Sequence, residues 1–541
     1  MTPVYVIVFH LRHPYMQDEI ELKLQSTPAM MQKIVTSRHV KKVKAGKMFS
    51  RNVVSTYFDT PRHTLRRAGI TLRIHHDGDG YEQTIKAPVT ESTGLRTWKE
   101  WTGRVPCNVP CVEAIEDREL RAILKRGKRD KRLVPMFTTN VERRTVPLKV
   151  GGSKHELALD IGTISAKDDT CREPIAGVGL ALRNGDATAI LDLVLKLNES
   201  LDLTLGRRSE AERGYALARP ALRPRARKAS KITLDPQMTV GDAFYRIKDS
   251  ALQHLYVNEM PVSEGRPEAI HQARVAIRRI RATLRAFKSV LPYDKRKAFN
   301  GEFRWFQRRL AHARDWHVFT DETLPAIKAA HPDRHEAITR LRKIALAERQ
   351  RATRDVTDIF ESRRYTRLML QFERWLATPS EVLDRSAIDQ PVADFAVEVL
   401  EKSRRDFLID TRPLSRMIGE DLHSLRKRGK KARYASEFFS GLWPESSTRP
   451  ILKKMEYIQD SLGIVNDAIV ARQLVVLTRP GLLDVQTVWL VQDWSATQIR
   501  ERIKQTQPHW RRFQRAKHFA VEPAESADLP HLASINSLKP A

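Results

Sequence analysis

The sequence predicts a two-domain α+β protein, with a β-rich domain first and an all-helical domain after it. The chain has 541 residues, which is more than one hydrophobic core usually organises. Short β-prone segments bounded by turn signals fill its first part, whereas long amphipathic stretches with few glycines follow residue 220. We therefore expect domains at 1–219 and 238–520, a basic linker at 220–237 and a disordered tail at 521–541.

The charge balance indicates a polyanionic partner. Lys and Arg total 95 against 65 Asp and Glu, a formal net charge of +30. Such an excess suits nucleic acid, an anionic membrane surface or a phosphate polymer. No uncharged apolar run reaches the ~18 residues of a membrane span, so no span is expected. Three cysteines and no export signal fit a cytoplasmic protein.

Four segments of the first domain have the composition of β-strands and are separated by pairs such as Gly151-Gly152. We expect strands at Val53–Phe58, Thr71–His75, Tyr81–Lys86 and Glu156–Ile161.

An earlier segment places charges on one side of a strand. Glu19, Glu21 and Lys23 alternate with aliphatic residues, so they share one face. This face either is the solvated side of an edge strand or lines the polar lumen of a barrel. Arg73 and Lys86 on other strands favour the barrel. Its cations would hold phosphates, and its carboxylates would hold Mg²⁺ or Mn²⁺.

These residues belong to an ordered series of motifs that resembles the CYTH superfamily, the triphosphate tunnel metalloenzymes. The series covers roughly residues 15–218 and comprises Glu19–Lys23, Tyr57–Pro61, Gly69–Arg73, Tyr81–Lys86, Glu156–Asp160 and Arg213–Tyr215. The resemblance implies an antiparallel eight-stranded β tunnel that binds triphosphate and a divalent metal, and that hydrolyses inorganic triphosphate.

The resemblance also implies site residues. The catalytic set is Glu19, Glu21 and Lys23, and the metal ligands for Mg²⁺ or Mn²⁺, if the tunnel is active, are Glu19, Glu21, Glu156 and Asp160. The phosphate ligands are Lys23, Arg73, Lys86, Arg143 and Arg213.

The sequence departs from this family where the chemistry should lie. Family members carry glutamates on a late strand, at the positions of Gly177, Gly179 and Ala181. Four further changes replace charged residues expected from the family, at His75, Trp98, Thr163 and Glu210. We therefore expect a folded tunnel that binds phosphate but has impaired catalysis. Its remaining charged residues either keep their family roles or form internal salt bridges. An active triphosphatase is the alternative.

The helical domain contains an internal repeat with an interval of 152 residues. The interval relates His271–Arg281 to His423–Arg433, and Arg314-Asp315 to Asn466-Asp467. A single interval that matches separated motifs indicates a duplication. We expect the two halves to pack about a pseudo-twofold axis.

Each copy carries a basic stripe at helical spacing. No acid falls within 272–290 or 424–436, so each stripe destabilises its helix unless acids from other helices or a polyanion neutralise it. A solvated basic face, nucleic-acid binding and a phosphate polymer are the three interpretations. Aromatic residues make up only 7% of the chain and neither stripe contains one, which disfavours base stacking. The stripes are His271, Arg274, Arg278, Arg281 and Arg285, and His423, Arg426, Lys430 and Arg433.

Residues of roughly 238–520 resemble the CHAD domain, which implies binding of inorganic polyphosphate and association with polyphosphate granules. By this resemblance the polyphosphate ligands are His271, Arg274, Arg278, Arg281, His423, Arg426, Lys430 and Arg433. Each histidine either donates to phosphate or makes a core hydrogen bond, and Asp315 and Asp467 either orient the cations or cap a helix. The expected function is polyphosphate binding, with inorganic triphosphatase second and a nucleic-acid-binding module third.

Overall fold

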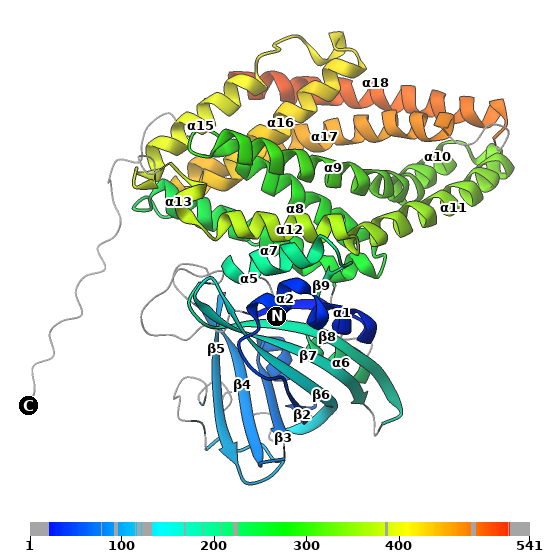
Figure 1. The fold of residues 1–541 in the computed structure, drawn as a ribbon. Coiled ribbons are helices and arrows are strands. Elements are labelled where there is room, and N and C mark those ends of the chain that lie inside the picture. Colours follow the sequence, from blue (N-terminus) through cyan, green and yellow to red (C-terminus); the bar gives the residue numbers. More distant parts are fainter. Residues whose placement is uncertain are drawn as a thin grey trace, which may run out of the picture.

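The computed structural model describes residues 21–76, 78–90, 96–113, 115, 121, 133–166, 169–186, 188–206, 208–219, 225–384, 388–477, 483–517 and 519. An antiparallel sheet is followed by a large helical body that lies against one end of it (Figure 1). The predicted α+β class is confirmed. Glu19 and the predicted tail at 521–541 lie outside the described residues.

The described part of the N-terminal domain forms one antiparallel sheet of nine strands in the order β5-β4-β3-β2-β6-β7-β8-β1-β9. The prediction of an eight-stranded closed tunnel is therefore wrong in strand count and in closure. Closure would require the two edge strands, β5 and β9, to pair, but the described residues form no such pair. The strands are β1 (Glu21–Gln25), β2 (Phe49–Asp59), β3 (Thr71–His76), β4 (Tyr81–Thr90), β5 (Arg96–Val105), β6 (Val134–Val150), β7 (Ser153–Ala166), β8 (Cys171–Asn184) and β9 (Thr204–Leu205).

Helix α6 (Glu210–Ala218) packs against β6, β7 and β8 through residues of the predicted motifs. The Tyr215 hydroxyl donates to Asp59 at the end of β2 (3.0 Å), and Arg213 donates to Glu173 of β8 (2.7 Å). A Cβ on Gly214 would lie 2.2 Å from the Phe137 ring, so only glycine permits this approach. These motif residues therefore attach α6 to the sheet.

The sheet domain also contains α1 (Pro28–Thr36), α2 (Arg38–Val43), α3 (Thr64–Ala68) and α5 (Thr188–Asn198). The helical domain contains α7 (Val240–Ser263), α8 (Pro267–Ala286), α9 (Tyr293–Val318), a π-helical segment (Phe319–Thr323), α10 (Leu324–Ala330), a 3₁₀ turn (Pro332–Arg334), α11 (His335–Phe360), α12 (Arg363–Leu376), α13 (Pro379–Val382), α15 (Val392–Phe407), a 3₁₀ turn (Leu414–Arg416), α16 (Gly419–Phe439), a 3₁₀ turn (Ser440–Leu442), α17 (Glu445–Leu477) and α18 (Val485–Arg515).

Three pairs of helices start 152 residues apart: α7 and α15, α8 and α16, and α9 and α17. The two halves exchange equivalent backbone hydrogen bonds, from Val240 N to the Gln390 carbonyl (2.9 Å) and from Val392 N to the Met238 carbonyl (3.0 Å). The equivalent Phe287 and Phe439 also meet, with ring centroids 6.0 Å apart. Such self-complementary contacts are those of a twofold arrangement.

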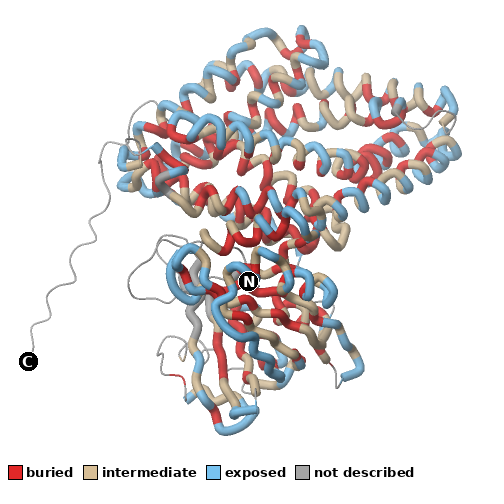
Figure 2. The backbone as a smooth tube through the Cα atoms, viewed as in Figure 1, coloured by how far each residue is buried: buried red, intermediate tan, exposed pale blue. Residues whose placement is uncertain are grey.

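The helical domain packs directly on the sheet domain. Helix α12 contacts α5, where Arg374 donates to Asp192 (2.9 Å) and Arg363 donates to the Asn198 carbonyl. One hydrophobic core continues through both domains, and it includes Ile232 and Leu234 of the predicted linker. Figure 2 shows the buried residues running through the helices nearest the sheet. The exact domain boundaries stay predictions.

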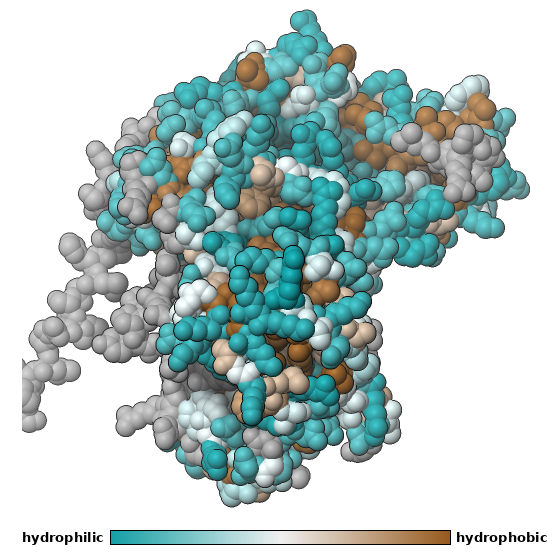
Figure 3. Space-filling model, viewed as in Figure 1, coloured by the Kyte–Doolittle hydropathy of each residue, from teal (hydrophilic) through white to brown (hydrophobic). Residues whose placement is uncertain are grey.

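The visible surface of the helical domain is largely hydrophilic, with apolar side chains toward the end formed by α17 and α18 (Figure 3). Val476, Val485 and Trp489 are exposed large apolar residues of these two helices. None of the helices in the described ranges is both long and apolar enough to cross a membrane.

Candidate anion-binding sites

Three predicted phosphate ligands converge on one face of the sheet. Lys23 of β1, Arg73 of β3 and Lys86 of β4 line a hollow of about 330 Å³, part of which is open to solvent. Antiparallel pairing explains the grouping, because directly opposed residues point to the same face. Arg73 lies opposite both Tyr57 and Thr84, and Lys86 lies opposite a residue two before Arg73 on β3. The hollow is also lined by Tyr57, Thr71, Thr84, Ser209, Glu210 and Ala211.

A carboxylate of α6 enters this cationic hollow. Glu210 is the first residue of the helix, directly after the N-cap Ser209. Burial by itself raises the pKa of the Glu210 carboxyl, but Lys23, Arg143, Arg73 and Arg213 together lower it below its usual value. Glu210 is therefore an ionised internal counter-ion, at a position where the family resemblance predicts a cation.

The other predicted site residues of the sheet are paired with one another or with neighbours. Arg143 makes a two-pronged hydrogen bond with Asp160 (2.7 Å for each prong). Glu156 accepts from Arg183 (2.7 Å), and Arg213 donates to Glu173 and to the Pro174 carbonyl. These pairings neutralise both predicted phosphate ligands and predicted metal ligands.

The strand register places the small residues of β8 beside the predicted metal ligands. Gly177 lies opposite Asp160, and Ala181 lies opposite both Glu156 and Glu21. Gly179 lies opposite Lys23. The face that would carry carboxylates in the family is thus bordered by β8 positions without a charge.

The described acids do not fit a divalent metal. Glu156 and Asp160 are already engaged by arginines, and no group of three His, Cys, Asp or Glu in the described ranges could hold an ion. Glu19 and the side chain of Glu21 lie outside the described part. Mg²⁺ and Mn²⁺ need several oxygen ligands, which this set does not offer.

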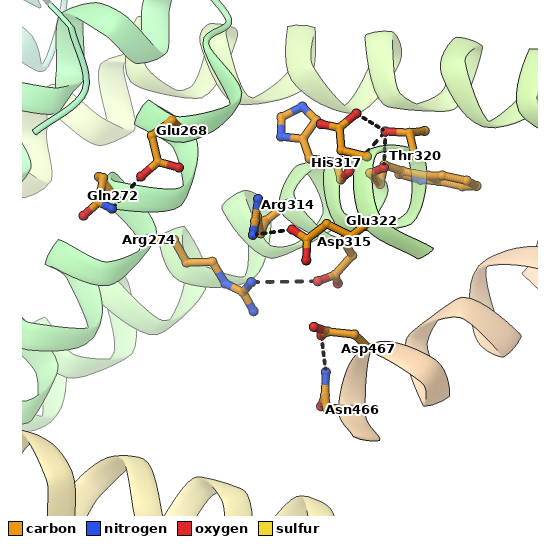
Figure 4. A network of polar contacts seen from close by, with 12 residues as sticks. Glu268, Gln272, Arg274, Arg314, Asp315, His317, Thr320, Glu322, Asn466 and Asp467 are labelled. Carbon is orange, nitrogen blue, oxygen red and sulfur yellow. Dashed lines mark hydrogen bonds and ion pairs between the residues drawn. The ribbon is translucent and has the colours of Figure 1, made fainter. Parts of the chain in front are cut away.

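A second site lies between the repeats of the helical domain. We call Arg274 and Arg278 of α8, together with Arg426 and Lys430 of α16, the central cluster. Two acids adjoin it (Figure 4): Asp315 lies 3.8 Å from Arg274, and Asp467 of α17 lies beside Asn466. Arg426 donates to the Asn466 amide oxygen (3.3 Å). The two repeats thus bring four basic residues and two acids to one place.

The surroundings of Lys430 and Arg274 in the central cluster disfavour their positive charges. Burial, then repulsion from Arg278, Arg426 and Arg274, lowers the pKa of Lys430 to about 5. Burial and the neighbouring Arg278 lower the pKa of Arg274 to about 10, although Asp315 opposes this effect. Such shifts are those of cations that have lost contact with water and whose neighbours do not supply enough negative charge to compensate.

Several donors of the central cluster also have no acceptor among the described residues. The Nε atoms of Arg274, Arg278 and Arg426 are buried without a hydrogen-bond partner in the described part of the chain. A buried unsatisfied donor costs about 1–3 kcal/mol, so an anion that accepts from these atoms would gain free energy.

The two predicted histidines lie in different surroundings, and helix capping, one of the two alternatives for the aspartates, is wrong. Burial, with Arg314 and Arg278, lowers the pKa of His271 to about 4, whereas His423 is exposed and hydrogen-bonds Asn466. Asp315 and Asp467 lie inside α9 and α17, so helix capping is wrong for both. Neighbouring polar contacts in Figure 4 include Arg314 donating to Glu322 (3.2 Å).

The two remaining predicted ligands have their own hydrogen-bond partners, on the flanks of the repeats. Arg281 donates to Asn300 (3.0 Å) and Gln307 (2.7 Å) of α9, and Arg433 donates to Glu437 (2.6 Å). The sequence reasoning missed Arg304 and Arg308, which lie near Arg281. Their i, i+4 spacing on one face of α9 was the available signal.

Comparisons with known proteins match both domains. The CYTH domain family matches residues 17–215, and the CHAD domain family matches residues 246–476. An inorganic triphosphatase from Haemophilus influenzae is 27% identical over 205 residues, which cover 37% of this chain and 55% of that protein. An uncharacterized protein from Mycobacterium tuberculosis is 25% identical over 441 residues, covering 77% of this chain and 80% of the relative.

Among solved structures, the CHAD domain from the plant Ricinus communis is 29% identical. It matches 53% of this chain and 96% of its own, with a TM-score of 0.45.

Proposed function

Because this chain carries a CYTH domain followed by a CHAD domain, we propose that it binds inorganic polyphosphate through the central cluster. The supporting observation is the excess of half-buried basic residues over acids. Four basic residues from two helices meet two carboxylates, and three Nε donors lack acceptors among the residues that the structure describes. A polyphosphate chain supplies a regular row of oxygen acceptors with negative charge, which this arrangement lacks.

A nucleic acid suits the central cluster less well. Tyr434 is an aromatic residue near Arg426, but it is buried, so it offers no platform on which bases could stack. Phosphate contacts alone carry no base specificity, so nucleic acid would bind there as a weaker polyanion.

We further infer that the CYTH domain binds phosphate groups but hydrolyses inorganic triphosphate poorly. Glu210 occupies the cationic hollow, Glu156 and Asp160 are bound by arginines, and β8 lacks the family's acids. The alternative is a metal-dependent inorganic triphosphatase using Mg²⁺ or Mn²⁺, and similarity to the Haemophilus influenzae triphosphatase favours it. Association with polyphosphate granules would follow from the binding function.

Retention of the full chain on immobilised long-chain polyphosphate tests the binding proposal. Replacing Arg274, Arg278, Arg426 and Lys430 by Glu should abolish retention while circular dichroism stays helical. The matched control reverses four exposed cations elsewhere on the helices: Lys328, Arg342, Lys343 and Arg354. Equal retention of the two variants would contradict the proposal.

Two further measurements separate the alternatives. Polyphosphate should displace bound RNA at equal phosphate concentration, and RNA should displace polyphosphate weakly. Release of phosphate from triphosphate with Mg²⁺ or Mn²⁺ should be slow in the parent chain. Rapid release that is abolished by Glu21→Gln would instead establish the triphosphatase.

A further inference from the structure

The two repeats of the helical domain carry opposite charges at equivalent positions beside the central cluster. The 152-residue interval that relates α8 and α9 to α16 and α17 also relates each flank residue to its counterpart. Only one of the four cations of the first repeat is kept as a cation in the second. The first flank is Arg281, Arg285, Arg304 and Arg308, and the second flank is Arg433, Glu437, Glu456 and Asp460.

The first flank is an uncompensated group of cations. Arg281 is held by the neutral oxygens of Asn300 and Gln307, which orient its guanidinium without cancelling its charge. Burial, then repulsion from Arg285, Arg304 and Arg308, lowers the pKa of Arg281 to about 10. Arg304 and Arg308 are exposed, and none of the four has an ion-pair partner among the residues that the structure describes.

The second flank is net negative, because three acids accompany its one arginine. Glu437 accepts from Arg433 at 2.6 Å, one helical turn away on α16. Glu456 and Asp460 of α17, also one turn apart, are both exposed. Burial raises the pKa of Asp460, and Arg433 and Glu456 both act on it, which places these acids around the one cation of this flank.

We propose that a polyphosphate chain runs from the central cluster over the first flank and is excluded from the second. The inference rests on the proposed function and adds a direction to it. Each successive phosphate brings further negative charge, which four arginines attract and three carboxylates repel. The site is thus asymmetric although the repeated helices are related by a pseudo-twofold arrangement.

The asymmetry predicts a dependence on chain length. A chain of a few phosphates can be held by the central cluster alone, whereas a longer chain gains contacts only on the first flank. Removing two of its cations should therefore weaken the binding of long chains and leave short chains nearly unaffected.

The experiment compares two variants of the full chain that alter equivalent positions. One is Arg304→Glu with Arg308→Glu, and the other is Glu456→Arg with Asp460→Arg. All four residues are exposed, so both variants should fold, which circular dichroism checks. Affinities for short and long polyphosphates are measured by isothermal titration calorimetry over a range of salt concentrations.

We expect the first variant to lose about tenfold or more in long-chain affinity, and its plot of log K against log salt to flatten by about two. The second variant should bind long chains more tightly than the parent. Equal effects of the two variants, or no effect of either, would overturn the inference. If the parent binds neither short nor long polyphosphate, the proposed function itself fails. If the parent binds both and only the flank variants differ from the expected result, the proposed path over the first flank alone fails.

Discussion

Arg143 makes a bidentate hydrogen bond with Asp160. The Nε and Nη2 atoms of its guanidinium each lie 2.7 Å from a different carboxylate oxygen. The family resemblance predicts that Arg143 binds phosphate and that Asp160 binds metal. In this chain the two satisfy each other across adjacent strands. Bidentate arginine–carboxylate pairs are strong and specific, so the residues hold the sheet together in place of a ligand.

Replacing one member of this pair should destabilise the sheet domain. Arg143→Met leaves a largely buried carboxylate unpaired and should lower the free energy of unfolding by about 2–4 kcal/mol. The double variant with Asp160→Leu should lose much less than the sum of the two single losses. Urea denaturation checks both statements, and additive losses would mean that the pair is not coupled.

Removing the internal counter-ion should open the hollow to phosphate. Glu210→Gln keeps the shape of the side chain but removes its negative charge. Lys23, Arg73 and Arg143 can then attract an anionic ligand instead. Affinity for inorganic triphosphate without metal should rise on the order of tenfold, or about 1.4 kcal/mol. Calorimetry checks this, with the surface variant Glu113→Gln as control; an unchanged affinity would mean that Glu210 does not compete with the anion.

Polyphosphate binding should take up a proton at Lys430. The free protein holds the pKa of Lys430 at about 5, chiefly by burial, so this amine is neutral at pH 7. A bound polyanion favours the charged form and raises the pKa, so affinity should fall as pH rises above neutrality. Calorimetry in buffers of different ionisation enthalpy measures the proton uptake.

Lys430→Arg should remove most of that uptake, because arginine stays protonated. His271, whose pKa of about 4 is also depressed chiefly by burial, is the second candidate, and His271→Gln controls for it. Uptake that persists in Lys430→Arg but vanishes in His271→Gln would assign the proton to the histidine.

Neutral histidines that are buried or half-buried should make the helical domain sensitive to acid. Burial lowers the pKa of His254, His271 and His317 to about 4. The unfolded chain, with histidine near 6.5, therefore binds more protons between about pH 4 and 6.5, and acidification favours unfolding by up to about 1.4 kcal/mol per pH unit for each.

Single variants are needed for the measurement, because Glu212 and Glu373 act in the opposite sense. Burial raises the pKa of each carboxyl to about 7, so the folded state takes up their protons first and gains stability as pH falls toward 4.5. His317→Gln should show a shallower loss of melting temperature than the parent between pH 6.5 and 5. Parallel curves would contradict a buried neutral His317.

The amino-acid sequence by itself determined the fold class, the motif positions and the duplication. Strand alternation and helical spacing are local, so Lys23, Arg73 and Lys86 could be assigned to one face, and the stripes around Arg274 and Arg426 to one side of their helices. The absence of acids at Gly177 and Ala181 could also be predicted from the sequence, because it follows from comparing this one strand with the family motif.

Tertiary structure alone decided how the charges are compensated. Arg143 and Asp160 are 17 residues apart, and Glu210 meets Lys23 from the far end of the domain, so neither pairing has a local signal. The sheet is open because its edge strands, β5 and β9, do not pair with each other in the described part of the chain. Each stripe is divided into a central cluster and a flank by the charged residues that α9 and α17 place beside it. Electrostatic neutralisation acts between atoms a few ångströms apart in space, whereas the sequence orders residues only along the chain.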